Sequence, residues 1–217
     1  MIQLDSIKTV YFVGIGGIGM SALARYFRHR GLRVSGYDRT ATRLTRALEG
    51  EGIAVHYAAD VAGLPDDLDL AVYTPAVPNG FAELTALRER GVPLLKRSAV
   101  LGIISRGMRT AAIGGTHGKT TTTTLTTHLM REAGLDPSAF LGGISRNFAG
   151  NFVAGKSDWV VVEADEYDRS FLQLDPDVAV ILSMDADHLD IYEDHQNMVD
   201  SGFMAFADRV KDGGRLL

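Results

Sequence analysis

Short apolar runs alternate with amphipathic segments along the first half of the chain, and glycines separate them. The apolar run 8–14 is followed by a helical pattern at 20–31 and by a second apolar run at 32–38. The alternation continues through a helical pattern at 81–91 to a strand pattern at 92–96. Strand, helix and strand in succession form the unit of a parallel sheet with helices on both faces. The pattern therefore predicts an α/β fold that opens with a Rossmann-like domain.

A second series of the same kind begins near residue 109. It comprises a strand pattern at 109–115, a long helix at about 119–133, and two apolar strands at 158–165 and 177–184. The polar segment 105–108 lies between the two series, so we expect two domains, 1–107 and 108–217. A helical pattern at 197–210 follows, and Leu216 and Leu217 begin another strand. We therefore expect the second domain to be incomplete.

Composition narrows the class of protein. The 217 residues are 46% hydrophobic, which is enough for a sizeable core. The 22 basic and 27 acidic residues are interspersed, which argues against a nucleic-acid surface. There is no cysteine, which excludes disulfides and thiolate chemistry. The sequence shows neither a leader peptide nor an apolar run near the roughly 20 residues of a membrane span, so we expect a cytoplasmic location.

The segment GGTHGKTT at 114–121 stands between a predicted strand and a predicted helix. Glycine-rich backbone can wrap a phosphate, Lys119 can reach terminal phosphates, and the Thr120 hydroxyl can bind Mg²⁺. The strict pattern of such loops would place glycine where Ile113 stands, so this is a shortened variant of the P-loop. The alternative is a glycine-rich turn that only caps the helix. The predicted ATP-binding residues are Gly115, Thr116, His117, Gly118, Lys119, Thr120 and Thr121.

Acidic residues follow the strand pattern that begins at residue 158. The carboxyl ends of parallel strands are where open α/β sheets bind ligands, and carboxylate oxygens suit Mg²⁺. Glu163 is the candidate metal ligand; Asp165, Glu166 and Asp168 lie beside it in sequence. A solvated acidic turn is the alternative for any one of them.

The next strand pattern is followed by Asp185, Asp187, His188 and Asp190. A histidine among carboxylates can bind metal or transfer a proton, although a lone histidine is more often a polar surface residue. If His188 meets Lys119 and Glu163 at one sheet edge, the three favour a two-metal phosphoryl-transfer site.

The segment VGIGGIGM carries Gly14, Gly16 and Gly19 in a G-x-G-x-x-G pattern after the first strand. Asp38 ends the next strand, where a ribose-binding carboxylate belongs. These features predict a pyrophosphate site without identifying the nucleotide. The alternative is close packing of the first helix on the sheet.

GTHGKTTTT, EADEYDRSFL, DADHLD, VGIGGIGM and SGYD together resemble the Mur ligases, the ATP-dependent amide-forming enzymes of peptidoglycan synthesis. The resemblance implies that the first domain binds the UDP part of UDP-N-acetylmuramate and that the central P-loop domain binds ATP and Mg²⁺. It also implies that the γ-phosphate is transferred to the sugar carboxylate, which the amine of L-alanine then attacks. The implied UDP-sugar residues are Gly14, Ile15, Gly16, Gly17, Ile18, Gly19, Asp38, Thr74 and Arg97.

By the same resemblance, the catalytic residues are Lys119, Glu163 and His188. Lys119 steadies the β- and γ-phosphates, Thr120 and Glu163 hold one Mg²⁺, and His188 helps to hold a second. Later Mur ligases carry a carbamylated lysine where this sequence has Phe203, which favours the alanine-adding branch.

Other functions remain open at this stage. A murein peptide ligase, which joins UDP-N-acetylmuramate to a ready-made peptide, is similar in GTHGKTT and EADEYD. The glycine fingerprint alone also fits a nicotinamide-dependent oxidoreductase, and the second loop fits a non-catalytic nucleotide-binding module. The family's sequence runs beyond residue 217 into a third domain. We therefore expect this chain to bind the UDP-sugar but not to ligate at a useful rate, with self-association through the open sheet edge as a hypothesis.

Overall fold

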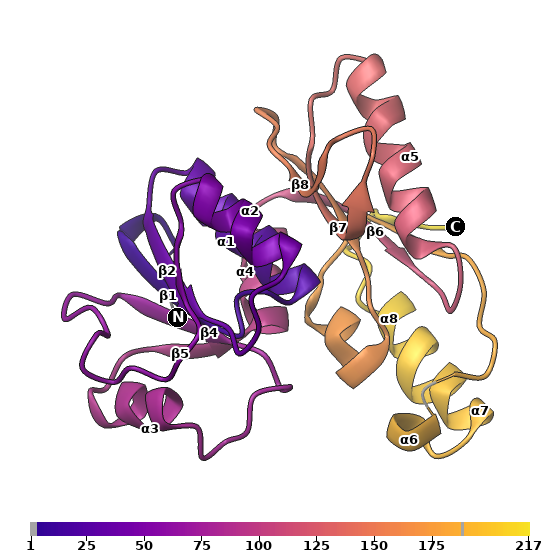
Figure 1. The fold of residues 1–217 in the computed structure, drawn as a ribbon. Coiled ribbons are helices and arrows are strands. Elements are labelled where there is room, and N and C mark those ends of the chain that lie inside the picture. Colours follow the sequence, from indigo (N-terminus) through magenta and orange to yellow (C-terminus); the bar gives the residue numbers. More distant parts are fainter. Residues whose placement is uncertain (1–3, 188) are drawn as a thin grey trace. The chain divides into compact units, whose positions relative to one another are not determined.

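The computed structural model describes residues 4–187 and 189–217, which divide into two compact units, Met1–Val100 and Leu101–Leu217. Helix α4 (Arg97–Arg106) spans the division between them. The expected domain boundary near residue 107 falls just after this helix, and its position stays a prediction. Each unit is built around one sheet (Figure 1).

Unit 1 contains a five-stranded sheet in the order β3-β2-β1-β4-β5, and every strand pair in it is parallel. This confirms the predicted Rossmann-like parallel sheet. The strands are β1 (Thr9–Val13), β2 (Arg33–Tyr37), β3 (Ala54–His56), β4 (Leu70–Tyr73) and β5 (Leu94–Lys96). The helices are α1 (Ile18–His29), α2 (Arg43–Gly50), α3 (Ala82–Glu89) and the short 3-10 helix η1 (Leu4–Ser6).

Strand β1 is buried along its whole length because helices cover both faces of its sheet. Successive side chains of a strand point to opposite faces. Phe12 packs against Phe27 of α1, with the ring centres 6.2 Å apart. Tyr11 and Val13 belong to a different cluster, which includes Leu84 of α3. The apolar run of β1 is uninterrupted because its side chains pack against helices on both faces of the sheet.

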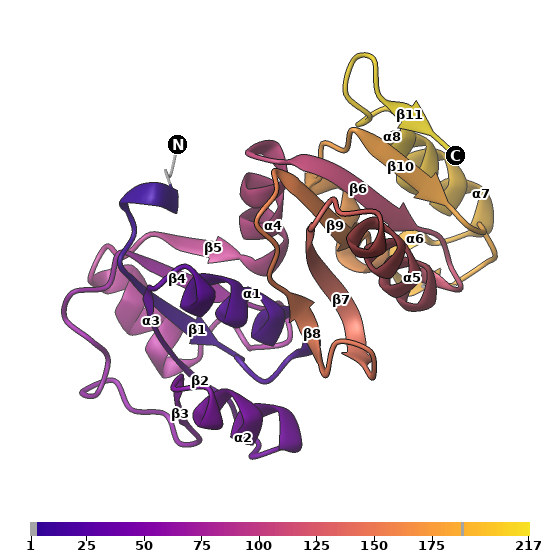
Figure 2. The same cartoon turned by 90° about the horizontal axis from the view of Figure 1, so that it is seen from above.

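The strand order reverses at the carboxyl end of β1. Strands β2 and β4 flank β1, so the chain continues to one side of it and later returns to the other (Figure 2). Open α/β sheets bind ligands where the strand order reverses in this way. Gly14 directly follows β1 and Thr74 directly follows β4, so both stand at this position.

Unit 2 contains a six-stranded sheet in the order β11-β10-β6-β9-β7-β8. The strands are β6 (Arg109–Gly114), β7 (Ser138–Ser145), β8 (Gly150–Val153), β9 (Trp159–Glu163), β10 (Val178–Ile181) and β11 (Arg215–Leu216). Besides α4, the helical segments are α5 (Lys119–Glu132), η2 (Tyr167–Gln173), α6 (Leu189–Tyr192), α7 (His195–Asn197), η3 (Met198–Met204) and α8 (Ala205–Ala207).

The hairpin of β7 and β8 is an element that the sequence pattern did not predict. The two strands pair antiparallel, whereas every other pair in the sheet is parallel. Gly142 and Gly143 interrupt the apolar run of β7, which weakened its strand signal. The predicted helix at 197–210 is present but continues through a π-helical segment, Met198–Met204.

The two faces of strand β6 meet different layers. Ile113 belongs to a core cluster against which Met130 of α5 packs, and α5 covers that face of the sheet (Figure 1). A Cβ on neighbouring Gly114 would lie 3.3 Å from the ring of Phe206, on the other face. There Phe171 packs against both Phe203 and Phe206, with ring centres 5.7 and 5.0 Å away. Phe203 is thus a core residue.

No helix in the described part of the chain has the length and apolar character that crossing a membrane requires.

Candidate active site

The P-loop begins where β6 ends and runs into α5. Gly115 has a φ of 121°, and a Cβ there would lie 2.8 Å from the backbone nitrogens of Leu182 and Ser183. Only glycine fits this position. Gly118, with a φ of 81°, caps the start of α5. The loop therefore needs glycine at both positions, and the predicted binding of a phosphate by its backbone stays a prediction.

The loop is braced by the segment that follows β10. The N–H of Thr116 donates to the carbonyl of Ser183 over 3.0 Å, and its hydroxyl donates to the carbonyl of Asp185 over 3.0 Å. The N–H of His117 donates to the Ser183 hydroxyl over 3.1 Å. The His117 ring is exposed, and its Nε2 lies 3.9 Å from Oδ2 of Asp185. The first and third sequence motifs thus lie side by side.

The side chain of Lys119 is directed onto three oxygen atoms. Its Nζ donates to the carbonyls of Gly115 and Thr116 over 2.8 and 3.2 Å, and to Oε1 of Glu166 over 2.9 Å. Glu166 is buried, with 1% of its side chain exposed. The sequence placed Glu166 among the candidate carboxylates without giving it a partner.

Thr120 and Glu163 come together beside this lysine. The Thr120 hydroxyl donates to Oε1 of Glu163 over 3.1 Å, and the N–H of Gly142 donates to Oε2 over 2.8 Å. Burial raises the pKa of Glu163, although both hydrogen bonds and the charge of Lys119 oppose the shift. The cost of burying this carboxylate is therefore only partly offset.

A hydroxyl and a partly buried carboxylate are hard oxygen ligands of the kind that Mg²⁺ takes. Thr120 and Glu163 therefore fit a bound Mg²⁺. His188 lies outside the described residues, as do the side chains of Asp168 and Asp190, so the metal role of His188 stays a prediction. Within the described residues, no group of three or more His, Asp or Glu side chains is gathered as a metal site.

Hydrogen bonds along α5 account for part of its threonine run. The hydroxyl of Thr123 donates to the carbonyl of Lys119 over 2.8 Å, and that of Thr127 donates to the carbonyl of Thr123 over 2.7 Å. Both threonines are fully buried, so their hydroxyls need such acceptors. Thr121, which was predicted to contact ATP, is exposed on the same helix.

In unit 1, the glycine-rich loop is held by the end of β2. The N–H groups of Gly14 and Ile15 donate to the carbonyl of Tyr37 over 2.8 and 2.9 Å. The N–H of Gly16 donates to Oδ2 of Asp38 over 2.7 Å, and Oδ1 accepts from the N–H of Thr40 over 3.0 Å. Asp38 therefore braces the loop itself, and its predicted contact with a ribose stays a prediction.

Thr74 and Arg97 also reach this loop. A Cβ on Gly14 would lie 2.7 Å from Cγ2 of Thr74, and one on Gly19 would lie 2.8 to 2.9 Å from Cδ and Nη1 of Arg97. Arg97 thus brings a guanidinium to the first turn of α1, where helix N–H groups favour an anion. Gly17 caps that helix, and Ile18, its first residue, is partly exposed.

A buried polar network in unit 1 was not anticipated from the sequence. Tyr11 donates its hydroxyl hydrogen to Oε2 of Glu83 over 2.5 Å, while Nε2 of His56 and the N–H of Asp60 lie 2.9 Å from Oε1. Burial, followed by the bond to Glu83, raises the pKa of Tyr11 far above its usual range, so the phenol stays neutral. The available signal was a glutamate beside the apolar residues of α3.

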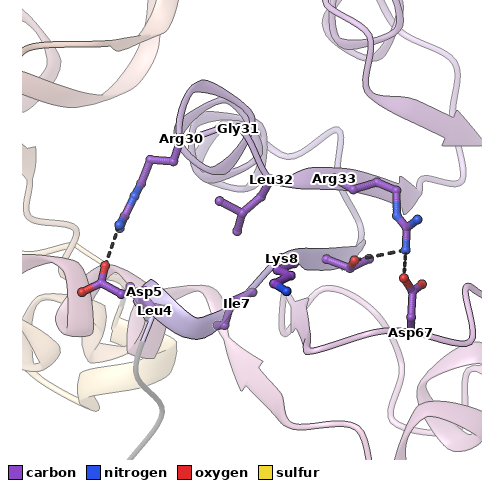
Figure 3. Close-up of a pocket in the computed structure, with 10 residues that line it drawn as sticks. Leu4, Asp5, Ile7, Lys8, Arg30, Gly31, Leu32, Arg33 and Asp67 are labelled. Atoms are coloured by element: carbon purple, nitrogen blue, oxygen red, sulfur yellow. Dashed lines mark hydrogen bonds and ion pairs between the residues drawn. The ribbon is translucent and has the colours of Figure 1, made fainter.

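A groove of about 580 Å³ lies at the amino ends of β1 and β2 (Figure 3). Its arginines face carboxylates: Arg30 pairs with Asp5 over 2.6 Å, and Arg33 pairs with Asp67. Gly14 and Asp38 lie at the carboxyl ends of the same strands, so this groove is separate from the glycine-rich loop.

Comparison with known proteins identifies the family. Residues 9–109 match the family described as "Mur ligase family, catalytic domain", and residues 113–217 match the "Mur ligase middle domain". The UDP-N-acetylmuramate–L-alanine ligase of Cytophaga hutchinsonii is 52% identical over 98% of this chain and 47% of its own length. The chain spans about half the length of the curated relatives it matches.

Solved structures agree with this result. The UDP-N-acetylmuramate-alanine ligase MurC of Thermotoga maritima matches with a TM-score of 0.86 and 32% identity, over 94% of this chain and 47% of that one. The UDP-N-acetylmuramate:L-alanyl-gamma-D-glutamyl-meso-diaminopimelate ligase of Neisseria meningitides matches with a TM-score of 0.87 and 28% identity, over 97% and 71%. On the two family matches and these relatives, the chain belongs to the Mur ligase family.

Proposed function

We propose that this chain is the UDP-sugar- and ATP-binding part of a ligase that joins L-alanine to UDP-N-acetylmuramate with ATP as co-substrate. The observation that carries the proposal is that Glu163 accepts a hydrogen bond from Thr120 and lies within reach of the charge of Lys119, at the P-loop of a Mur ligase chain. A lysine, a hydroxyl and a carboxylate there are the groups that phosphoryl transfer needs.

Each residue of this site has a defined role in the proposed reaction. Lys119 steadies the β- and γ-phosphates, and Thr120 and Glu163 would hold Mg²⁺, which neutralises phosphate charge when bound. A carboxylate oxygen of the sugar bonds to the γ-phosphorus as the bond to the ADP oxygen breaks. The amine of L-alanine then attacks the acyl phosphate, phosphate leaves, and an amide forms. The chain's contribution is to position these groups and stabilise their charge.

Unit 1 binds the UDP part of the sugar substrate in this proposal. The N–H groups at the start of α1 and the guanidinium of Arg97 would face the pyrophosphate, beside Thr74. We infer a cytoplasmic location, because the reaction consumes ATP and the sequence has no cysteine that an oxidising compartment would cross-link.

A murein peptide ligase is the second candidate, because the Neisseria structure matches this fold as closely as the Thermotoga one does. Sequence favours the alanine ligase: curated relatives with that name are 44% to 52% identical, and among the two solved structures the Thermotoga alanine ligase is 32% identical, against 28% for the Neisseria protein. Supplying L-alanine or a peptide to a chain extended to the length of its relatives would separate the two.

The test for the 217-residue chain is calorimetric titration with UDP-N-acetylmuramate and then with ATP·Mg²⁺. Gly16→Val should abolish binding of UDP-N-acetylmuramate and leave binding of ATP unchanged, since a side chain there would overlap Asp38 and Thr45. Lys119→Ala should abolish binding of ATP and leave binding of UDP-N-acetylmuramate unchanged. If Gly16→Val still binds UDP-N-acetylmuramate, the UDP-sugar site is not at this loop of unit 1. If the folded chain binds neither UDP-N-acetylmuramate nor ATP, the proposal is refuted.

Self-association is a separate hypothesis. Strand β11 forms one edge of its sheet, and Leu216 and Leu217 are 50% and 72% exposed. An open edge of this kind can pair with a second chain. Light scattering that shows a monomer at high concentration would refute it.

A further inference from the structure

The contact between Lys119 and Glu166 has no part in the proposed chemistry, although it involves the central lysine of the loop. The ion pair is 2.9 Å long and nearly buried, with 15% of the lysine side chain and 1% of the glutamate side chain exposed. Ion pairs in such surroundings are poorly screened by salt. The negative charge of Glu166 therefore acts strongly both on Lys119 and on any phosphate that binds to Lys119.

The bonds of Lys119 leave it fully engaged without a nucleotide. An ammonium has three hydrogen-bond donors, and Nζ contacts three oxygens, on Gly115, Thr116 and Glu166. A phosphate oxygen must therefore displace one of them to receive a donor. The carboxylate is the partner to be displaced, because its negative charge would repel the phosphate.

Glu166 is held from a second direction by Tyr192. The Tyr192 hydroxyl donates to the backbone carbonyl of Glu166 over 2.7 Å, and the side chain is fully buried. A Cβ on Gly202 would lie 3.0 Å from the ring of Tyr192, so the π-helix η3 presses against it. The guanidinium carbon of Arg169 lies 5.2 Å from the ring centre. Tyr192 thus links the backbone of Glu166 to α6.

We propose that Glu166 is the resting counter-ion of Lys119, positioning it over the loop until a nucleotide phosphate replaces the carboxylate, and that Tyr192 holds Glu166 in place. Glu166 is then a positioning residue that weakens nucleotide binding, in contrast to Glu163, which strengthens it through a metal. This inference rests on the proposed binding of ATP at the P-loop.

The decisive variant is Glu166→Gln, which keeps the size of the side chain and removes its charge. We expect ATP to bind about tenfold more tightly, because the carboxylate that competes with the phosphates for Lys119 loses its charge. Tyr192→Phe should also raise the affinity for ATP, but only about threefold, since it removes one hydrogen bond to the backbone of Glu166 and leaves the carboxylate in place. The double variant should bind no more tightly than Glu166→Gln alone. Asp158→Asn, which removes an exposed charge at the other end of β9, is the matched control.

A second readout does not require nucleotide. Acetylation by N-hydroxysuccinimidyl acetate, mapped by mass spectrometry, compares Lys119 with the exposed Lys156 in the same chain. Lys119 should react several-fold faster relative to Lys156 in Glu166→Gln and Tyr192→Phe, because the amine is no longer held by a buried carboxylate.

The outcomes separate this inference from the proposed function. ATP binding by the wild-type chain with unchanged or weaker binding by Glu166→Gln overturns the counter-ion role and leaves the proposed function standing. Unchanged acetylation of Lys119 overturns it as well. If neither chain binds ATP, the proposed function of the loop fails and this inference fails with it. Should Glu166→Gln not fold, Tyr192→Phe with wild-type affinity and labelling overturns the inference.

Discussion

The hydroxyl of Thr120 lies 3.1 Å from Oε1 of Glu163, although 43 residues separate the two along the chain. Thr120 is the second residue of α5, and Glu163 is the last residue of β9. They meet because β6, which leads into the P-loop, pairs with β9 in parallel register, so both strands end at one edge of the sheet. A hydroxyl and a carboxylate thereby meet beside the glycine-rich loop that precedes α5.

Replacing Thr120 by valine should weaken binding of ATP·Mg²⁺ about tenfold, because valine keeps the shape of the side chain and removes the hydroxyl oxygen that we propose as a ligand of the cation. Binding of ATP without Mg²⁺ should change little. Titration calorimetry with and without Mg²⁺ measures both. Thr126→Val makes the same change further along α5 and is the control. Equal losses with and without Mg²⁺ would contradict a metal role for Thr120.

Adding a methyl group at Gly19 should separate binding from stability in unit 1. In Gly19→Ala, the new Cβ would displace the flexible end of Arg97, 2.8 to 2.9 Å away. We expect UDP-N-acetylmuramate to bind about tenfold more weakly, since Arg97 would be moved away from the position where we propose that it binds the pyrophosphate. Thermal stability should hold or rise, because alanine is favoured over glycine in a helix by about 1 kcal/mol.

Gly50→Ala is the control for this prediction. Gly50 ends α2, and a Cβ there would meet nothing within 4 Å. Its sugar affinity should match that of the wild-type chain. A Gly19→Ala chain that binds the sugar normally would show that Arg97 does not contact it.

The sequence was sufficient to predict elements whose apolar pattern is uninterrupted. Strand β1, for example, is buried along its length, and the run 8–14 predicted it. The meeting of Thr120 with Glu163 was also predictable, because parallel strands end at a common edge of the sheet. The motif, the position of Glu163 at the end of a predicted strand and the ligand chemistry of carboxylates all pointed to one location.

The sequence could not show contacts that depend on the register of side chains between distant elements. Glu166 and Asp165 are adjacent acids in one motif, yet only the structure shows that Glu166 turns to Lys119. Asp38 likewise fits a ribose ligand by position, whereas in the structure it accepts the N–H of Gly16. The hairpin of β7 and β8 was missed because its glycines obscured the strand pattern.

Removing the carboxylate of Glu83 should destabilise unit 1 by about 2 to 4 kcal/mol, because the buried hydroxyl of Tyr11 and the N–H of Asp60 would lose their acceptor. Hydrogen exchange of the β1 amides reports on unit 1 and measures the loss in Glu83→Ala. Glu89→Ala, at an exposed position on the same helix, should change the exchange little.

The pairing of Tyr11 with Glu83 makes this prediction sharper. In a double-mutant cycle with Tyr11→Phe, the double variant should lose less stability than the sum of the two single losses, by about 1 kcal/mol or more. Losses that add would show that the 2.5 Å hydrogen bond contributes nothing of its own.

Asp177 should make the stability of unit 2 depend on pH in the acid range. Burial alone would raise the pKa of Asp177, but hydrogen bonds from Lys211 and from the N–H of Thr110 outweigh burial and hold this pKa below its ordinary value. A lowered folded pKa means that the stabilisation is fully present above the unfolded pKa of about 4. It is lost as the pH falls through the folded value.

We therefore expect Asp177→Asn to lower the free energy of unfolding by about 1 kcal/mol at about pH 7, a figure kept small because the pair is partly exposed. The difference from the wild-type chain should begin to shrink as the pH falls below about 4, where the carboxylate of the unfolded chain takes up a proton, and should vanish below the lower folded pKa of Asp177. Urea unfolding followed by Trp159, the only tryptophan, reports on unit 2. Asp158→Asn, at an exposed carboxylate next to β9, should show no such convergence. A difference that persists unchanged into acid would mean that Asp177 stabilises the fold through its shape and not through its charge.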